Sequence, residues 1–176
     1  MQRELNLELR SFPQLSDCDL AYIAGLFDGE GMVGVYPQSK RVSKGVRRGA
    51  NNQSYLLKVA IKMGNAESVL QWLHLVFGGT KLSLEDRSTD GRARTPMLGF
   101  QIHSGEAARF LKTIRPWLKV KDKQADLALE FWGVWSVSPN KQGAFALAKA
   151  KELAEALHSI KGPASRGRHG SRGRRE

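Results

Sequence analysis

Residues 20–31 read Leu20-Ala21-Tyr22-Ile23-Ala24-Gly25-Leu26-Phe27-Asp28-Gly29-Glu30-Gly31. Large apolar side chains at Leu20, Ile23 and Phe27 recur at the spacing of one helix face, so this stretch predicts an amphipathic helix. Two glycines then flank Glu30, and glycine after a helix end commonly supplies the left-handed backbone that turns the chain. We therefore expect a core helix that ends abruptly and holds the carboxylate of Glu30 at a sharp turn, where it is a candidate metal ligand.

A second strip of the same helix consists of small residues. Ala21, Ala24 and Gly25 would let the backbone of another helix approach closely. Ser16, three residues before Asp19, predicts a helix N-cap with an acid in the first turn, so the helix is expected over about 17–28. The open alternative is an ordinary core helix followed by a glycine-rich turn, with both acids merely solvated.

Composition limits the partners of this chain. Its 176 residues suit one domain with a core of its own, and a formal net charge of +11 indicates a polyanionic partner. Nucleic acid is the leading candidate, ahead of an acidic membrane surface. The single Cys18 excludes an intrachain disulfide, and no apolar run approaches the length of a membrane span. The first residues lack the character of a signal peptide, so we expect a soluble intracellular protein, in a prokaryotic cytoplasm or an organelle interior.

The apolar periodicity switches repeatedly between the helix and strand patterns. Helices are expected near 17–28, 65–77 and 105–114, after 125 and near 142–160; strands are expected near 32–36, 55–63, 80–85 and 96–102. Pro37 limits the first strand to an edge of its sheet. The predicted fold class is α+β: a duplicated α-β-β unit in the order αββαββα, with a four-stranded antiparallel saddle-shaped sheet, helices on one face and extra C-terminal helices. The expected organisation is a leader at 1–15, a single domain at 16–160 and a disordered basic tail at 161–176.

The second expected strand shows how the two faces of the sheet differ. Leu57, Val59 and Ile61 alternate with Lys58 and Lys62, so one face is apolar and the other presents ammonium groups. This pattern fits a sheet with one face on a core and the other on a polyanion, and a solvated lysine face is the open alternative. The candidate phosphate-binding residues are Lys40, Arg41, Lys44, Arg47, Arg48, Arg87, Arg92 and Arg94, the candidate base-reading residues are Tyr36, Gln38, Lys58, Lys81 and Gln101, and Lys123 is a further candidate DNA contact.

Two separated segments resemble the LAGLIDADG family of homing endonucleases. The first reads Ile-Ala-Gly-Leu-Phe-Asp-Gly-Glu-Gly over 23–31, with Glu in place of the second Asp of the family name. The second, Pro-Trp-Leu-Lys-Val-Lys-Asp-Lys-Gln-Ala over 116–125, is similar to the Pro-aromatic-Leu-x-x-Lys-x-Lys-Gln-Ala segment of the family's single-motif homodimeric enzymes. The resemblance covers about 16–135, and since no second copy of the first motif occurs near 100–125, it implies a homodimer.

The resemblance also implies roles for individual residues. Glu30 would be the catalytic acid that binds a divalent cation, with the carbonyl of Gly29 beside it. Lys121 matches the family's lysine in the catalytic pocket, Lys62 is assigned near the attacking water, and Asp28 is assigned to the helix end. The dimer contact would use Ala21, Ala24 and Gly25.

The function implied is that of an intron-encoded, site-specific endonuclease that hydrolyses both strands of DNA with Mg²⁺ and leaves short 3′ overhangs. The expected target is a long pseudo-palindromic duplex, Mn²⁺ or Ca²⁺ could replace Mg²⁺ for binding, and no membrane partner is expected. Two alternatives stay open: a maturase that acts on host intron RNA, and a DNA-binding protein that does not cleave. The four histidines show no zinc-ligand or HNH spacing, which favours structural roles for His74, His103, His158 and His169.

Overall fold

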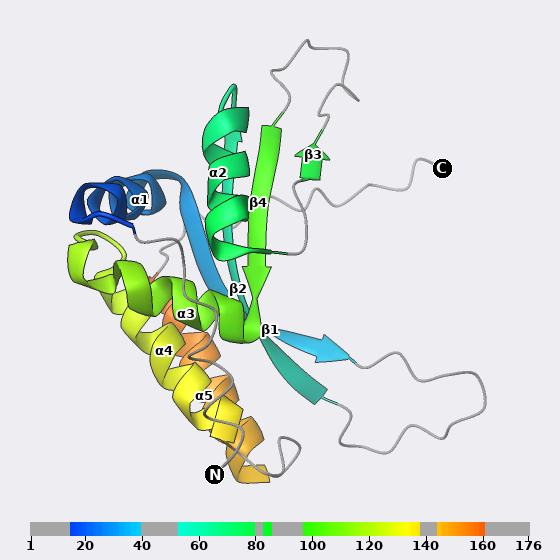
Figure 1. Cartoon of the computed structure of the whole chain (residues 1–176). Helices are drawn as coiled ribbons and strands as arrows, with labels where there is room; N and C mark the ends of the chain where they lie inside the picture. The colour runs from blue at the N-terminus through cyan, green and yellow to red at the C-terminus, as the bar shows by residue number, and fades with distance from the viewer. Residues whose placement is uncertain (1–14, 40–52, 80–82, 86–96, 138–143, 161–176) are drawn as a thin grey trace, which may run out of the picture.

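The computed structural model describes residues 15–39, 53–79, 83–85, 97–137 and 144–160 (Figure 1). The elements are α1 (Asp17–Glu30), β1 (Gly31–Ser39), β2 (Gln53–Gly64), α2 (Glu67–Phe77), β3 (Ser83–Glu85), β4 (Met97–His103), α3 (Ser104–Ile114), the 3-10 turn η2 (Arg115–Trp117), α4 (Asp122–Val137) and α5 (Ala144–Ile160). No helix within these ranges is both long enough and apolar enough to cross a membrane.

The four strands form one antiparallel sheet in the order β1-β2-β4-β3. Each hairpin follows a helix, and the two hairpins join through β2 and β4 in the middle of the sheet. The predicted α+β fold with a duplicated α-β-β unit is therefore confirmed. β1 lies at an edge, where Pro37 pairs with Tyr55 although proline has no backbone N–H to donate.

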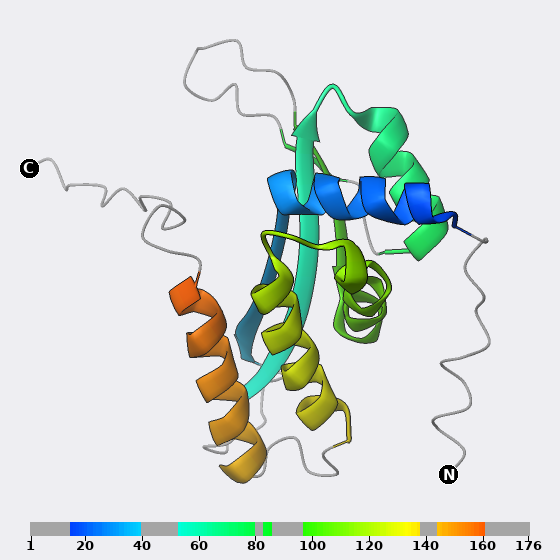
Figure 2. The ribbon, with the colours of Figure 1, turned by 90° about the vertical axis from the view of Figure 1, so that its left-hand side faces the viewer.

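The helices cover one face of the sheet, and the core lies between these two layers (Figures 1 and 2). Alternate strand residues point to this side and are buried, namely Val33, Val35, Leu57, Val59, Ile61, Phe100 and Ile102. The Phe110 ring of α3 is central to the core, since its centroid lies 5.5 Å from that of Phe27 in α1 and 4.8 Å from that of Phe77 in α2. α3 therefore fixes α1 and α2 against the sheet through aromatic contacts.

The start of α1 is fixed by a reciprocal pair of side-chain hydrogen bonds. The backbone N–H of Asp19 donates to Ser16 Oγ at 3.2 Å, and the backbone N–H of Ser16 donates to the Asp19 carboxylate at 3.0 Å. This capping box satisfies N–H groups that have no partner within the helix. The predicted N-cap at Ser16 is confirmed.

The end of α1 differs from the prediction. The helix continues to Glu30, and Gly31 has φ −75° and ψ 151°, which is extended backbone. Among the described glycines, positive φ occurs at Gly78 and Gly79 after α2, so the expected left-handed turn beside Glu30 is wrong. Glycine is required at position 31 because a Cβ there would lie within 3.0 Å of the ring and the carbonyl of Phe27. The helix runs directly into β1 and holds Glu30 at the junction.

Candidate functional site

The carboxylate of Asp28, in the last turn of α1, holds the segment between η2 and α4. Its Oδ2 accepts the N–H groups of Lys119 at 2.8 Å and Val120 at 3.1 Å, and its Oδ1 accepts that of Lys121 at 2.8 Å. Burial would raise the pKa of Asp28, but the three main-chain donors and the charge of Lys121 outweigh it and hold the pKa below its usual value. Asp28 therefore ties the α1 terminus to a segment more than 90 positions later.

The ammonium group of Lys121 sits on the C-terminal end of α1. Its Nζ donates to the carbonyl of Phe27 at 2.9 Å and to the carbonyl of Asp28. A cation at this end satisfies carbonyls that lack helical partners and complements the helix dipole. Burial lowers the pKa of Lys121, and the carboxylates of Asp28 and Glu30 oppose that shift. A positive charge is thus fixed where Glu30 leaves the helix.

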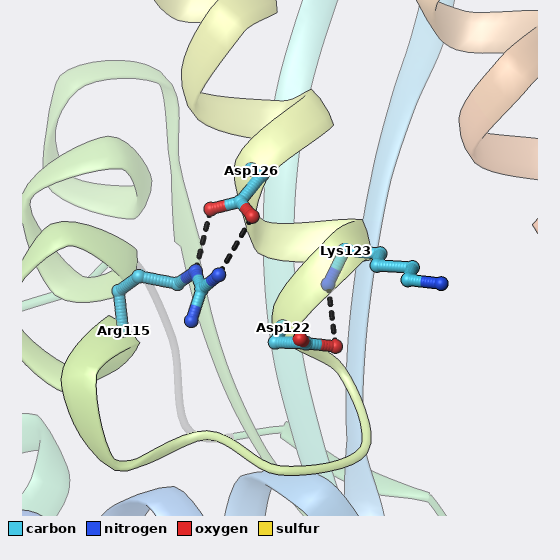
Figure 3. A network of polar contacts seen from close by, with 4 residues as sticks. All are labelled: Arg115, Asp122, Lys123 and Asp126. Atoms are coloured by element: carbon cyan, nitrogen blue, oxygen red, sulfur yellow. Dashed lines mark hydrogen bonds and ion pairs between the residues drawn. The ribbon is translucent and has the colours of Figure 1, made fainter.

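An ion pair closes the base of the segment that carries Lys121 (Figure 3). Arg115 donates from Nε and Nη2 to the two carboxylate oxygens of Asp126, at 2.5 and 2.7 Å. The neighbouring Asp122 carboxylate accepts the backbone N–H of Lys123 at 2.8 Å, while the Lys123 side chain points away from the ion pair (Figure 3). The segment is therefore fixed at both ends, and Lys123 is left exposed on the surface.

Glu30 and Lys62 lie at the same corner of the molecule. Pairing between β1 and β2 ends at Gly31 and Ile61, so Lys62 follows the last paired residue of β2, beside the junction of α1 and β1. Because Ile61 is buried under the helices, its neighbour Lys62 belongs to the opposite, open face of the sheet. Glu30 and Lys121 thus interact electrostatically at the end of α1, and Lys62 lies on the neighbouring strand β2.

The donors at this corner fit a hard divalent cation. The exposed carboxylate of Glu30 and the adjacent carbonyl of Gly29 are oxygen ligands, and Mg²⁺ usually takes one or two carboxylates together with waters and substrate phosphate. In the described part of the chain, no three His, Cys, Asp or Glu side chains form a group that could hold a metal ion. A single carboxylate suits a cation that is shared with substrate more than a structural metal.

The open face of the sheet carries the polar side chains that the strand pattern predicted. Tyr36, Gln38, Lys58 and Gln101 all occupy positions that alternate with the buried core residues of their strands. An open hollow of about 420 Å³ lies on this face, lined by Tyr36, Gln38, Leu56, Lys58 and His103. Four candidate base-reading residues therefore share one surface.

His103 is a member of this surface that sequence reasoning missed. It lies opposite Lys58 in the β2–β4 register, and its Nε2 is 2.8 Å from Nε2 of Gln101. Burial and the charge of Lys58 lower the pKa of His103, with Glu106 opposing them. The available signal was its place in β4 two residues after Gln101, which puts both side chains on one face.

Solved structures of homing endonucleases align with most of this chain. One is the homing endonuclease I-CvuI in complex with DNA, at a TM-score of 0.63 and 18% identity over 88% of this chain and 86% of that chain. A second is the archaeal intron-encoded homing endonuclease I-Vdi141I complexed with DNA, at a TM-score of 0.63 and 16% identity over 91% and 89%. The LAGLIDADG homing endonuclease I-GzeII, also with DNA, aligns at a TM-score of 0.55 and 11% identity over 77% and 43%. This chain has the LAGLIDADG homing endonuclease fold.

The aligned share of the solved chain differs among these structures. The match to the meganuclease I-SmaMI, at a TM-score of 0.61 and 12% identity, covers 90% of this chain but 54% of that one. The alignment thus spans most of the I-CvuI and I-Vdi141I chains and about half of the I-SmaMI chain. No protein-family model matches the sequence, and no curated protein matches it.

The motif helix of the LAGLIDADG fold has an inner and an outer side in this chain. Ala24 is 0% exposed and belongs to the core, so its assignment to a partner contact is wrong. Ala21 and Gly25 are exposed, and a Cβ added at Gly25 or Gly29 would meet nothing within 4 Å. The outer side of α1 is therefore a strip of small residues with open space above it.

Several predicted features lie outside the described residues. They are the basic tail at 161–176, nearly all of the leader at 1–15, and the candidate DNA contacts Lys40, Arg41, Lys44, Arg47, Arg48, Lys81, Arg87, Arg92 and Arg94.

Proposed function

We propose that this protein is a site-specific endonuclease that hydrolyses both strands of double-stranded DNA with the help of Mg²⁺. The observation that carries the proposal is the convergence of Glu30 and Lys121 at the end of α1, at the edge of an open sheet face with polar side chains. The match to DNA-bound homing endonucleases over most of the chain supports it.

The residues divide the chemical work at this corner. Glu30 and the carbonyl of Gly29 would hold Mg²⁺, which when bound supplies Lewis-acid activation and charge neutralisation at the scissile phosphate. The ammonium group of Lys121, which the α1 carbonyls hold in place, stabilises the negative charge that develops on the phosphoryl oxygens. Lys62 orients the attacking water from the end of β2. Short 3′ overhangs are the expected products.

DNA binding belongs to the open face of the sheet. A β-sheet surface of this kind fits the major groove, where the edges of all four base pairs can be distinguished. Tyr36, Gln38, Lys58 and Gln101 contact base edges, and the cations beside the sheet hold phosphates. Because the formal net charge is +11, binding is expected to weaken steeply with salt.

The active form is a homodimer with a pseudo-palindromic target. The equivalence of this chain to about half of I-SmaMI supports it, since two copies would make up the longer chain. Ala21, Gly25 and Gly29 give the outer side of α1 the open strip on which the partner's α1 packs. The two Glu30 side chains then lie close together, and divalent cations beside them reduce their repulsion.

Glu30→Gln tests the nuclease directly. Duplexes selected from a randomised double-stranded DNA pool serve as binding and cleavage substrates in Mg²⁺. The variant is expected to keep its affinity for these duplexes but to lose at least about 100-fold in cleavage, since even partners of metal ligands cost about 10–100-fold. Glu155→Gln, an equal charge change at an exposed position on α5, serves as the control and cleaves normally. Wild-type protein that binds DNA without cutting it in Mg²⁺ or Mn²⁺ would overturn the nuclease assignment.

Gly25→Leu tests the dimer. A Cβ at position 25 meets nothing within 4 Å in the single subunit, so we expect the fold to be retained, while the leucine blocks close helix approach between subunits. Sedimentation at micromolar concentration should give a dimer for the wild type and a monomer for the variant. A wild-type monomer under these conditions contradicts the homodimer.

A further inference from the structure

Gln101 and His103 form a contacting pair on the open face of β4. Their Nε2 atoms are 2.8 Å apart, which is hydrogen-bond distance. In the β2–β4 register Gln101 lies opposite Ala60, a small residue, and His103 lies opposite Lys58. The pair therefore stands beside the hollow that Lys58 and His103 help to line.

The orientation of the Gln101 carboxamide, which turns its nitrogen towards His103, sets the direction of this hydrogen bond. A carboxamide nitrogen carries two N–H donors and accepts no hydrogen bond, so Nε2 of His103 is the acceptor and the ring proton is on Nδ1. This arrangement requires a neutral ring. Burial and the positive charge of Lys58 on β2 favour the neutral ring by lowering its pKa, and Glu106 on α3 opposes them.

The hydrogen bond changes what Gln101 can offer to a base pair. One of its two N–H groups is used on His103, which leaves one donor and the carbonyl oxygen. Adenine presents a donor at N6 and an acceptor at N7 in the major groove, whereas guanine presents acceptors at both N7 and O6. With a single N–H left, the amide matches adenine and cannot donate to both acceptors of guanine.

We propose that His103 is a specificity-determining residue, which restricts Gln101 to adenine at one position in each half of the DNA target. The inference rests on the proposed DNA-binding function and identifies part of its base code. His103 acts through Gln101, so it is a positioning residue and not itself the base contact.

Base preference is the quantity that tests this role. Wild-type protein is used to select duplexes from a randomised double-stranded DNA pool, and the selected site is then measured by competition with each position changed in turn. Gln101→Leu identifies the position that Gln101 reads. At that position we expect the wild type to prefer adenine over guanine roughly tenfold, within the range of a good bidentate contact, and His103→Leu to lower the preference to about threefold or less.

Three further variants separate positioning from a general structural role. His103→Gln keeps an acceptor within reach of Gln101 and should restore the adenine preference. The double variant of Gln101→Leu with His103→Leu should match Gln101→Leu alone. His74→Leu makes the same change on α2, on the helix side, and should leave every base preference unaltered.

The outcomes distinguish failure of the proposed DNA binding from failure of the role of His103. If the pool yields no enriched sequence, the proposed site-specific DNA binding fails and the role of His103 fails with it. If a site is enriched but His103→Leu keeps the full adenine preference, or if His103→Gln and His103→Leu lower it equally, only the role of His103 is overturned. If His103→Leu lowers the affinity for all duplexes equally and leaves the base preference unchanged, the role of His103 is also overturned.

Discussion

At the end of α1 the side chains of Asp28 and Lys121 bind main-chain atoms, whereas on the open face of the sheet the polar side chains contact other side chains. Asp28 accepts three backbone N–H groups, and Lys121 donates to two backbone carbonyls. On the sheet, Gln101 contacts His103, and the Tyr36 hydroxyl donates to the Met32 sulfur at 3.8 Å.

This difference in anchoring matches the two tasks that we propose, phosphodiester cleavage at the end of α1 and base recognition on the open face of the sheet. Chemistry at a phosphate needs groups held within a fraction of an ångström, and main-chain anchors supply this because the backbone of α1 is itself fixed by the core. Recognition of a base sequence needs donors and acceptors that still face outward. The α1 end is therefore built as a rigid site, and the sheet face as a set of adjustable contacts.

The largest expected effect comes from breaking the rigidity at the α1–β1 junction. Gly31→Ala places a Cβ against the ring and carbonyl of Phe27, so we expect a loss of about 3 kcal/mol in the free energy of unfolding, near the top of the overpacking range. The matched control is Gly133→Ala, an exposed helical glycine with nothing within 4 Å of the added Cβ, which should gain about 0.5–1 kcal/mol. Urea denaturation measures both. If Gly31→Ala were as stable as the wild type, the close approach of Phe27 would not be the reason for glycine at position 31.

A smaller effect is expected from weakening the Asp28 anchor. Asp28→Asn replaces one acceptor oxygen with an amide that faces backbone donors, which should cost about 1–2 kcal/mol at pH 7 in metal-free buffer. The pKa of Asp28 is lower in the folded state, so its stabilisation is complete above the usual value of 3.8 and is lost as pH falls through the folded value. The difference in stability between wild type and Asp28→Asn should shrink below pH 3.8. The control is Asp122→Asn, which keeps an oxygen that can accept the single N–H of Lys123 and should cost less stability at pH 7. A pH-independent difference would contradict the ionised anchor.

The smallest expected effect is electrostatic and concerns Lys123, beside the rigid site. Lys123→Met removes one exposed cation, so affinity should fall equally for all DNA sequences and the log–log salt slope should drop by about 1 for each subunit. Lys112→Met on α3, on the helix side, makes the same charge change and should leave the slope unaltered. A changed base preference in Lys123→Met would mean that the α1 corner also reads sequence.

Much of the fold could be predicted because it depends on local patterns. The alternation in β2, the capping residues Ser16 and Asp19 and the helical spacing in α2 each act within a few residues. The reason for Gly31 could not be predicted, since it depends on the position of the Phe27 ring. Ala24 was misassigned for a similar reason: a small residue suits both a helix contact and a crowded core, and only packing distinguishes them.

The sequence by itself determined the order of the elements, the two faces of the sheet and the identity of the acid at the end of α1, because periodicity, capping and charge are written along the chain. Tertiary structure alone decided that Asp28 holds the 119–121 segment and that Lys121 caps α1, and the sequence placed His103 and Gln101 on one face of β4 without showing that their side chains meet. The first two of these contacts join segments more than 90 residues apart, and the third depends on side-chain orientation. Neither distance in space nor orientation leaves a pattern in the sequence.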